Sequence, residues 1–236
     1  MELAKRLAVL ALQVPAGSVV ADIGTDHAYL PVYLVEKGIC HGVIATDLNP
    51  GPFRSAVSKV EERGLGSKID LRLGYGLKVL QPGEADVLVL AGMGGNTIRE
   101  ILAASPEVLK TVQKLVLQPM ADPGDLRTWL ASNGWRISDE HLLQEDGRIY
   151  VVVAAEPGRE KTEDSCLLEL GPRLLEKKDP LMDVYLQGIV EKYERALNGL
   201  AAARSGAARE RAGALKARLE RIKEVWRNAG KVRGDI

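Results

Sequence analysis

Short apolar runs alternate with helical patterns along the first part of the chain, and this alternation limits the fold more than any other feature of the sequence. Strand-like runs occupy residues 18–23, 42–46, 68–73, 85–90 and 114–117, and helical patterns lie at residues 29–36, 50–64, 96–104 and 123–132. Parallel strands need crossover connections of this length, which are usually helices. The pattern therefore predicts a doubly wound α/β domain, in which both faces of a parallel sheet are covered.

The last two strand-like runs are connected differently. Residues 135–143 and 148–155 are separated only by residues 144–147, which are too few for a crossover helix. We therefore expect these two strands to form an antiparallel hairpin. Together with the five alternating units, the hairpin gives a Rossmann-like, seven-stranded sheet whose last strand is antiparallel.

The chain changes character after Glu156. Residues 157–236 are rich in Ala, Leu, Glu, Lys and Arg and contain no strand-like run, so we predict two domains, 1–156 and 157–236. Helical patterns at 181–203 and 208–228 carry apolar residues at spacings of three and four, with a break at Ser205 and Gly206. Two such helices joined by a short link predict an antiparallel coiled-coil hairpin.

Charge is unevenly distributed between these two parts. Residues 1–156 hold 15 Lys and Arg against 19 Asp and Glu, whereas residues 157–236 hold 17 against 13. Between Arg204 and Arg233 there are ten basic residues and only three acidic ones. A stretch of this kind favours a polyanionic partner, and the alternative is a helix face that only aids solubility.

The remaining composition points to a cytoplasmic protein. The two cysteines, Cys40 and Cys166, lie far apart and belong to no CxxC pair, so neither a disulfide scaffold nor a metal site is expected. The N-terminal segment has the pattern of an amphipathic helix rather than of a signal sequence, and no window reaches the roughly 18 apolar residues that span a bilayer. We expect no membrane partner.

In an open parallel sheet, ligands bind beyond the carboxyl ends of the strands, where the strand order reverses. The candidate residues therefore lie in the segments that follow the first four strands. They are Asp22, Gly24, Thr25, Asp26, His27 and Tyr29 after the first, Asp47, Leu48 and Asn49 after the second, Gly74, Tyr75 and Gly76 after the third, and Ala91, Gly92 and Met93 after the fourth.

Two of these segments contain acidic residues that suit the binding of a nucleoside cofactor. Asp47 ends the second strand, 23 residues after Gly24, and an acid at this spacing can accept hydrogen bonds from both hydroxyls of a ribose. The first segment is not GxGxxG, and Asp26 lies where a diphosphate would need uncharged donors. A carboxylate there would repel a diphosphate but could pair with the ammonium group of S-adenosylmethionine.

Three strings of residues resemble those of a known family. Residues 21–31 read ADIGTDHAYLP, residues 91–95 read AGMGG, and residues 117–120 read LQPM. The chain resembles the bacterial TrmK family of tRNA methyltransferases over essentially its whole length. The resemblance implies a Rossmann-like class I methyltransferase with a coiled-coil tail, transferring methyl from S-adenosylmethionine to N1 of adenine 22 in the D-arm of tRNA. Where Asn is expected after the third strand, this chain has Tyr75.

The resemblance also implies roles for individual residues. Asp22, Gly24, Asp26, Tyr29, Asp47, Gly74, Gly76, Ala91 and Gly92 correspond to the cofactor site. Methylation of N1 makes adenine cationic, so a carboxylate could stabilise the product or a base could remove a proton from the exocyclic amine. Asp26 is the first candidate for this role, and Tyr29 is a candidate for stacking or hydrogen bonding.

Three alternatives remain open from the residues alone. The chain could be a methyltransferase for a small molecule or protein, with the tail serving as a dimerisation hairpin. It could be an RNA-binding protein with a degenerate cofactor fold, although intact Asp22, Gly24 and Asp47 disfavour this. A nicotinamide oxidoreductase is disfavoured because GxGxxG is absent. The oligomeric state is expected to be a monomer or weak dimer.

Overall fold

A computed structural model describes residues 3–201 and 206–231 of the chain. The predicted break at Ser205 and the basic residues Arg204 and Arg233 lie outside this described part, as do residues 202–203 of the predicted helix. The chain divides into two compact units, Met1–Lys161 and Thr162–Ile236. The division therefore falls between Lys161 and Thr162, whereas the sequence placed it after Glu156. The two units are described separately.

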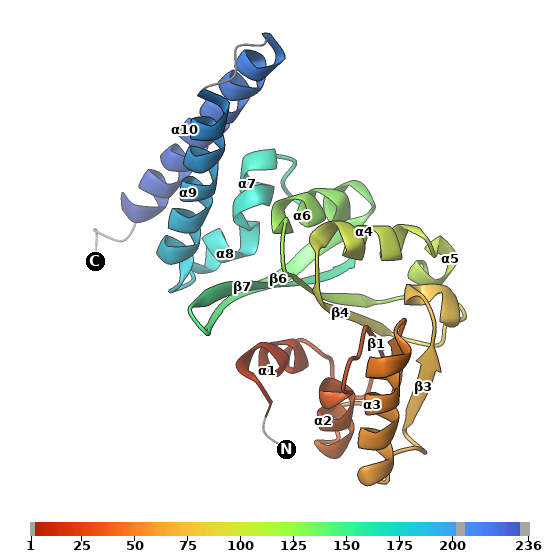
Figure 1. The fold of residues 1–236 in the computed structure, drawn as a ribbon. Coiled ribbons are helices and arrows are strands. Elements are labelled where there is room, and N and C mark those ends of the chain that lie inside the picture. The colour runs from red at the N-terminus through yellow and green to blue at the C-terminus, as the bar shows by residue number, and fades with distance from the viewer. Residues whose placement is uncertain (1–2, 202–205, 232–236) are drawn as a thin grey trace. The chain divides into compact units, whose positions relative to one another are not determined.

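The first unit is built on one seven-stranded sheet (Figure 1). Its strands are β1 (Val19–Ile23), β2 (Gly42–Asp47), β3 (Ile69–Leu73), β4 (Val87–Met93), β5 (Lys114–Pro119), β6 (Trp135–Glu145) and β7 (Arg148–Pro157). Their order is β3-β2-β1-β4-β5-β7-β6. The first five strands pair in parallel, and β7 pairs antiparallel with both β5 and β6. The predicted Rossmann-like topology is confirmed.

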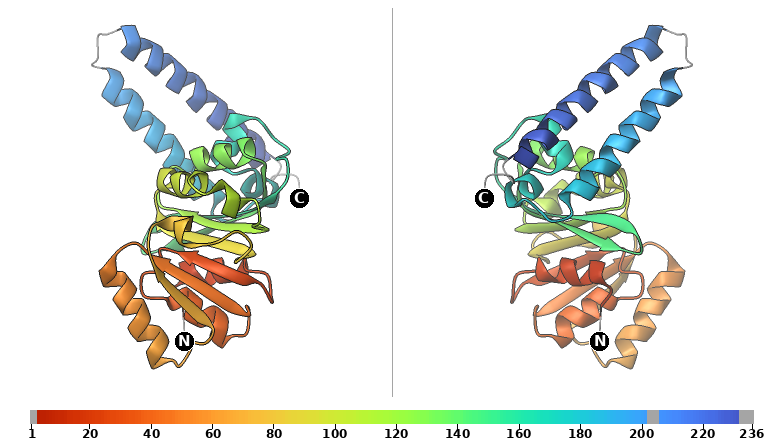
Figure 2. Two further views of the ribbon diagram at one scale, coloured as in Figure 1. Left: turned by 90° about the vertical axis from the view of Figure 1, so that its right-hand side faces the viewer. Right: turned by 90° about the vertical axis from the view of Figure 1, so that its left-hand side faces the viewer.

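Helices cover both faces of this sheet (Figures 1 and 2). On one face lie α1 (Lys5–Leu12), α2 (Tyr29–Glu36) and α3 (Pro50–Glu62), and on the other lie α4 (Gly95–Ala103), α5 (Pro106–Leu109) and α6 (Pro123–Ser132). Alternate strand residues face opposite sides, so Val20 belongs to the core under α1–α3 while its neighbour Ala21 is buried on the other side. Both faces are thereby buried.

The terminal hairpin is confirmed, with longer strands and a shorter link than predicted. Only Asp146 and Gly147 connect β6 to β7, and both have positive φ angles, 50° and 73°. Two consecutive residues in this conformation match the right-handed twist of the flanking strands. Asp-Gly is a preferred sequence for such a turn, because Gly has no Cβ and Asp tolerates the left-handed region.

Several features of the first unit differ from the sequence-based expectation, among them the short helix α5, which was not predicted. Strand β4 continues to Met93 rather than ending at Leu90, with an irregularity between Ala91 and Met93 where Gly92 has a φ of 77°. A short 3₁₀ helix, Gly76–Val79, follows β3. Ala91, Gly92 and Met93 therefore belong to the end of a bulged strand and not to a free loop.

The second unit consists of helices. The short helices α7 (Ser165–Leu170) and α8 (Pro172–Lys177) were not predicted, and they are followed by α9 (Met182–Ala201) and α10 (Gly206–Lys231). The last two form an antiparallel hairpin, which confirms the prediction (Figure 2). Trp226 Nε1 donates to Asp183 Oδ1 at 3.0 Å, near the start of α9. We refer to Thr162–Ile236 as the arm.

No helix in residues 3–201 and 206–231 is long and apolar enough to cross a membrane. Within the same residues, no group of three or more His, Cys, Asp or Glu side chains is arranged to hold a metal ion.

Candidate functional site

The strand order places β1 between β2 and β4, so the segments following these strands meet at the switch point of the sheet. The main-chain N–H groups of Gly24 and Thr25 both donate to the Thr46 carbonyl oxygen, each at 2.9 Å. These bonds tie the turn after β1 to the end of β2. The structure thus brings together the two segments that the sequence singled out first.

The Asp47 side chain holds this turn in place by accepting hydrogen bonds from the main chain. Its Oδ2 accepts from the main-chain N–H of Asp26 at 3.1 Å, and its Oδ1 accepts from that of Asn49 at 2.8 Å. The residue is only 6% exposed, whereas Leu48 beside it is 54% exposed. Each carboxylate oxygen can accept more than one hydrogen bond. The group is therefore held rigidly by the main chain and keeps acceptor capacity for a ligand.

Asp22 lies deeper, within β1, and is 5% exposed. Burial raises the pKa of its carboxyl to about 6, and the nearby Asp47 charge adds to the shift. Such a group is mostly ionised at neutral pH, but its charge is poorly solvated. It can therefore contribute negative potential beneath the turn without being in open contact with solvent.

Asp26, His27 and Tyr29 point outward from the same turn. The Asp26 side chain is 65% exposed and the His27 side chain 47% exposed, with 3.6 Å between His27 Nε2 and Asp26 Oδ1. The centroids of the His27 and Tyr29 rings are 5.6 Å apart. Asp26 and Ala28 both have a φ of 54°, a strained conformation for residues with a Cβ. This backbone holds the Asp26 carboxylate where a cation could reach it.

The segment after β3 has a packing requirement of its own. A Cβ on Gly74 would overlap the Val79 side chain, and a Cβ on Gly76 would lie 2.9 Å from Ile101 Cγ2. Gly76 also has a φ of 54°. The family resemblance places both glycines in the cofactor site, and in the structure the protein's own side chains already require glycine at both positions. Tyr75 is 38% exposed beside this turn.

The end of β4 completes the switch point. A Cβ on Gly24, whose φ is 79°, would lie 3.0 Å from Met93 Cε, so the Met93 side chain reaches the turn after β1. Ala91 and Met93 are partly buried, and Gly92 between them is exposed. The predicted residues of the first, second and fourth segments therefore form one contiguous surface.

Two residues beside this surface were missed by the sequence analysis. Gln118 is fully buried, and its Oε1 accepts from Arg6 NH1 at 2.9 Å and from the Gly92 N–H at 3.1 Å. The LQPM string contained Gln118 but gave it no role. Arg6 lies 112 residues away in α1, so no local pattern connects it with β5.

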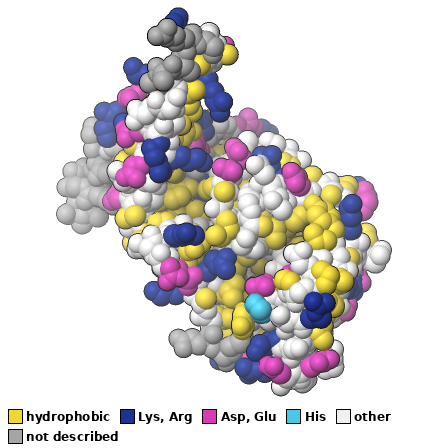
Figure 3. Space-filling model, viewed as in Figure 1, with side chains coloured by type: hydrophobic (Ala, Val, Ile, Leu, Met, Phe, Trp, Pro, Cys, Tyr) yellow, Lys and Arg dark blue, Asp and Glu magenta, His cyan; other side chains and the backbone are white. Residues whose placement is uncertain are grey.

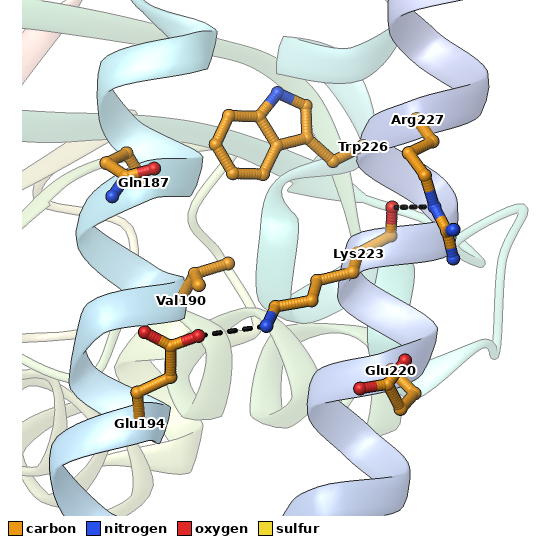
Figure 4. A pocket seen from close by; sticks show the side chains of 7 residues that line it. All are labelled: Gln187, Val190, Glu194, Glu220, Lys223, Trp226 and Arg227. Carbon is orange, nitrogen blue, oxygen red and sulfur yellow. Dashed lines mark hydrogen bonds and ion pairs between the residues drawn. The ribbon is translucent and has the colours of Figure 1, made fainter.

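The arm offers a separate, basic surface. In the space-filling view Lys and Arg side chains lie along its helices, interspersed with acidic ones (Figure 3). Lys223 turns toward α9, where its Nζ lies 2.9 Å from Glu194 Oε1 (Figure 4). Arg218 pairs with Glu169 on α7 at 2.6 Å. Arg209 and Lys216, by contrast, are exposed. The basic residues of α10 therefore divide into some that hold the arm together and some that face solvent.

A groove on one side of the helical hairpin belongs to the arm alone. Gln187, Val190 and Glu194 of α9 line it together with Glu220, Lys223, Trp226 and Arg227 of α10 (Figure 4). Val190 is buried and the Trp226 indole is bonded to Asp183. The groove is thus the seam of the hairpin.

Comparisons with known proteins agree on one family. Residues 20–224 match the TrmK family, described as tRNA (adenine(22)-N(1))-methyltransferase. The tRNA (adenine(22)-N(1))-methyltransferase of Bacillus subtilis is 42% identical over 184 residues, which are 76% of this chain and 77% of the relative. The crystal structure of the B. subtilis M1A22 tRNA methyltransferase TrmK has a TM-score of 0.89 at 36% identity, covering 95% of this chain and 98% of that one. A Streptococcus pneumoniae protein solved in complex with S-adenosyl-L-methionine has a TM-score of 0.85 at 36% identity, covering 95% of this chain and 99% of that one.

Proposed function

This chain belongs to the TrmK family of tRNA (adenine(22)-N(1))-methyltransferases, and we propose that its switch-point surface binds S-adenosylmethionine and presents the methyl group to N1 of adenine 22 in the D-arm of tRNA. The protein is an S-adenosylmethionine-dependent tRNA methyltransferase. The observation that carries the proposal for the site is the hydrogen bond from the Asp26 N–H to Asp47, which joins the two cofactor-binding segments.

Asp47 is proposed to bind the ribose of the cofactor. Its carboxylate is fixed by two main-chain donors, at 3.1 Å and 2.8 Å, and both oxygens keep acceptor capacity. Two vicinal hydroxyls match a carboxylate of this kind, because each can donate to one oxygen. Gly24 lets the neighbouring chain turn with a φ of 79°, and this brings the main chain close to the same ligand.

Asp26 is proposed to face the methionine end of the cofactor. Its exposed carboxylate can pair with an ammonium group. A turn that binds a diphosphate could not tolerate a carboxylate at this position, because the carboxylate would repel the diphosphate. The other proposed cofactor-binding residues surround these three. They are Asp22, Thr25, His27, Tyr29, Leu48, Asn49, Gly74, Tyr75, Gly76, Ala91, Gly92 and Met93.

The reaction mainly requires that the methyl group and adenine N1 are aligned. Bound S-adenosylmethionine supplies a methyl group already activated by the positive sulfonium, so the protein has to hold adenine N1 in line with it. Tyr29 is proposed to stack on the base, because this aromatic residue is 41% exposed at the start of α2. Asp26 is proposed to stabilise the positive charge that develops on the methylated adenine, or to accept a proton from its amine.

The arm is proposed to bind the body of the tRNA through phosphate contacts. Arg209 and Lys216 lie seven residues, or about two turns, apart on α10, and both are exposed. Cations at such positions can follow a phosphate backbone without reading its sequence. We also propose that the protein acts in the cytoplasm, since both of its cysteines are free, as a reducing compartment would keep them.

The test is direct analysis of methylated tRNA. Two transcripts that differ only in adenine or guanine at position 22 are incubated with the protein and isotope-labelled S-adenosylmethionine, and their nucleosides are analysed by mass spectrometry. We expect labelled N1-methyladenosine from the first transcript and none from the second. Label in both transcripts, or label in another nucleoside, would reject the proposed target. Asp26→Asn serves as the comparison for the proposed catalytic role and should lower kcat.

A further inference from the structure

Arg6 lies at the carboxyl ends of β4 and β5, beside the switch-point surface. Its NH1 donates to Gln118 Oε1 at 2.9 Å, and its guanidinium carbon lies 5.8 Å from the centre of the Tyr150 ring. A Cβ on Gly92 would lie 3.3 Å from the same NH1. The guanidinium therefore contacts residues of β5 and β7 and lies beside β4, although α1, which carries it, precedes every strand along the chain.

Gln118 fixes the orientation of Arg6. Its Oε1 also accepts from the Gly92 N–H at 3.1 Å, and its Nε2 donates to the Pro119 carbonyl at 3.2 Å. Two N–H donors point at Gln118 Oε1, and a carbonyl oxygen accepts from Gln118 Nε2. If the amide were flipped, its NH2 group would face those two donors. The side chain is fully buried. A buried, fully oriented amide thus presents the Arg6 guanidinium in one direction.

Within the described part of the chain, the Arg6 charge is not paired with an acid. Among residues 3–201 and 206–231, no carboxylate pairs with its guanidinium, and the first turn of α1 contains no acidic residue. A cation in the first turn of a helix is itself unfavourable, because the amino-terminal end of the helix dipole is positive. The Nε and NH2 groups of Arg6 donate to no described residue, which leaves three N–H donors of the five available.

We propose that Arg6 is an oxyanion-binding residue of the methyl-transfer site, positioned by Gln118 and Tyr150. Its three remaining donors form the planar fork that binds a carboxylate or a phosphate through two parallel hydrogen bonds. In this site the oxyanion is either the carboxylate of the methionine part of S-adenosylmethionine or a phosphate of the tRNA next to the target adenine. The inference rests on the proposed function, because it takes its ligands from that reaction.

The test compares Arg6→Ala with Lys5→Ala. Lys5 is a matched control, since it is the preceding residue of α1, has the same charge and is exposed. Binding of S-adenosylmethionine is measured by calorimetry and binding of tRNA by filter retention. We expect Arg6→Ala to weaken one of the two affinities about tenfold or more, because a bidentate charge-assisted contact is lost. Loss of cofactor affinity identifies the carboxylate, and loss of tRNA affinity identifies the phosphate.

A second variant keeps Arg6 in place. Gln118→Glu puts a carboxylate where Oε1 now meets NH1 at 2.9 Å, and an ion pair there should reproduce the Arg6→Ala loss. If both affinities in Arg6→Ala stay within twofold of Lys5→Ala, or if Gln118→Glu binds both ligands like the wild type, the oxyanion site is refuted. A wild-type protein that binds both ligands but leaves adenine 22 unmethylated would refute the proposed function instead.

Discussion

The buried carboxyl of Asp22 makes stability depend on pH in a direction that can be worked out. Its pKa rises from the ordinary value of 3.8 to about 6 on folding, mainly through burial. The folded state therefore resists ionisation of this group. Ionised Asp22 therefore lowers the free energy of unfolding. This loss of stability is absent below pH 3.8, grows as the pH rises and is complete above about pH 6. Asp22→Asn removes the ionisation, so the variant should gain stability relative to the wild type as the pH rises.

The size of the effect follows from the two pKa values. A shift of about 2 units corresponds to about 3 kcal/mol at neutral pH, at 1.36 kcal/mol per unit. At pH 5 the carboxyl is mostly ionised in the unfolded protein but mostly protonated in the folded protein, and linkage gives about 2 kcal/mol. The difference in unfolding free energy between Asp22→Asn and wild type should therefore widen by about 1 kcal/mol between pH 5 and pH 7.

Urea denaturation of the ligand-free proteins at pH 5, 6 and 7 measures this difference. Effects of the substitution that do not depend on pH cancel when the pH values are compared. Asp125→Asn is the matched control, since Asp125 is exposed in α6 and the variant makes the same side-chain change outside the buried core. A constant or shrinking difference for Asp22→Asn would refute the assignment of a buried, poorly solvated carboxylate under the turn after β1.

Three further sets of substitutions test other parts of the molecule. Asp47→Ala should raise the dissociation constant for S-adenosylmethionine about tenfold or more in calorimetry, since two charge-assisted hydrogen bonds of about 1.5–3 kcal/mol each are lost. An unchanged constant would argue against the ribose contact. Replacing Arg209 and Lys216 by Gln should weaken tRNA binding and reduce its salt dependence by about 0.7–0.9 per residue in a log–log plot; an unaltered slope would exclude them from phosphate contact. Arg127→Met should lower the unfolding free energy by about 3–5 kcal/mol, because the Glu140 charge, paired with Arg127 at 2.5 Å and 0% exposed, stays buried. Adding Glu140→Leu should recover most of that loss in urea denaturation, and a failure to recover would point to packing instead of charge.

The sheet and the Asp47 segment could be predicted because their signals are local. Each strand is a short apolar run, most crossovers contain an α-helix, and the order of the strands then follows from the fold. The acid at the end of β2 and the glycine after β1 are recognisable in the sequence. Their hydrogen-bonded connection through Asp26 is consistent with that reading. The need for glycine at position 76 could not be predicted from the neighbouring sequence, because the atom that a Cβ there would contact belongs to Ile101 in α4.

Other features depend on contacts that no local pattern encodes. Helices α7 and α8 have six residues each, which is too short for a clear apolar period. The contact of Arg6 with Gln118 requires α1 to pack against the sheet and is invisible in either segment alone. The basic residues of α10 looked alike in the sequence, and only the structure distinguishes Arg218, which pairs with Glu169, from those facing solvent.

The position of β7 has a consequence for how the polypeptide is made. Although β7 is the last strand to leave the ribosome, it lies inside the sheet, between β5 and β6. Until residue 157 has emerged, β5 has an open edge that β7 will later occupy, and unpaired edges of this kind can pair with other chains. A nascent chain arrested just after β6 should therefore be far more prone to aggregate than one arrested a few residues beyond β7.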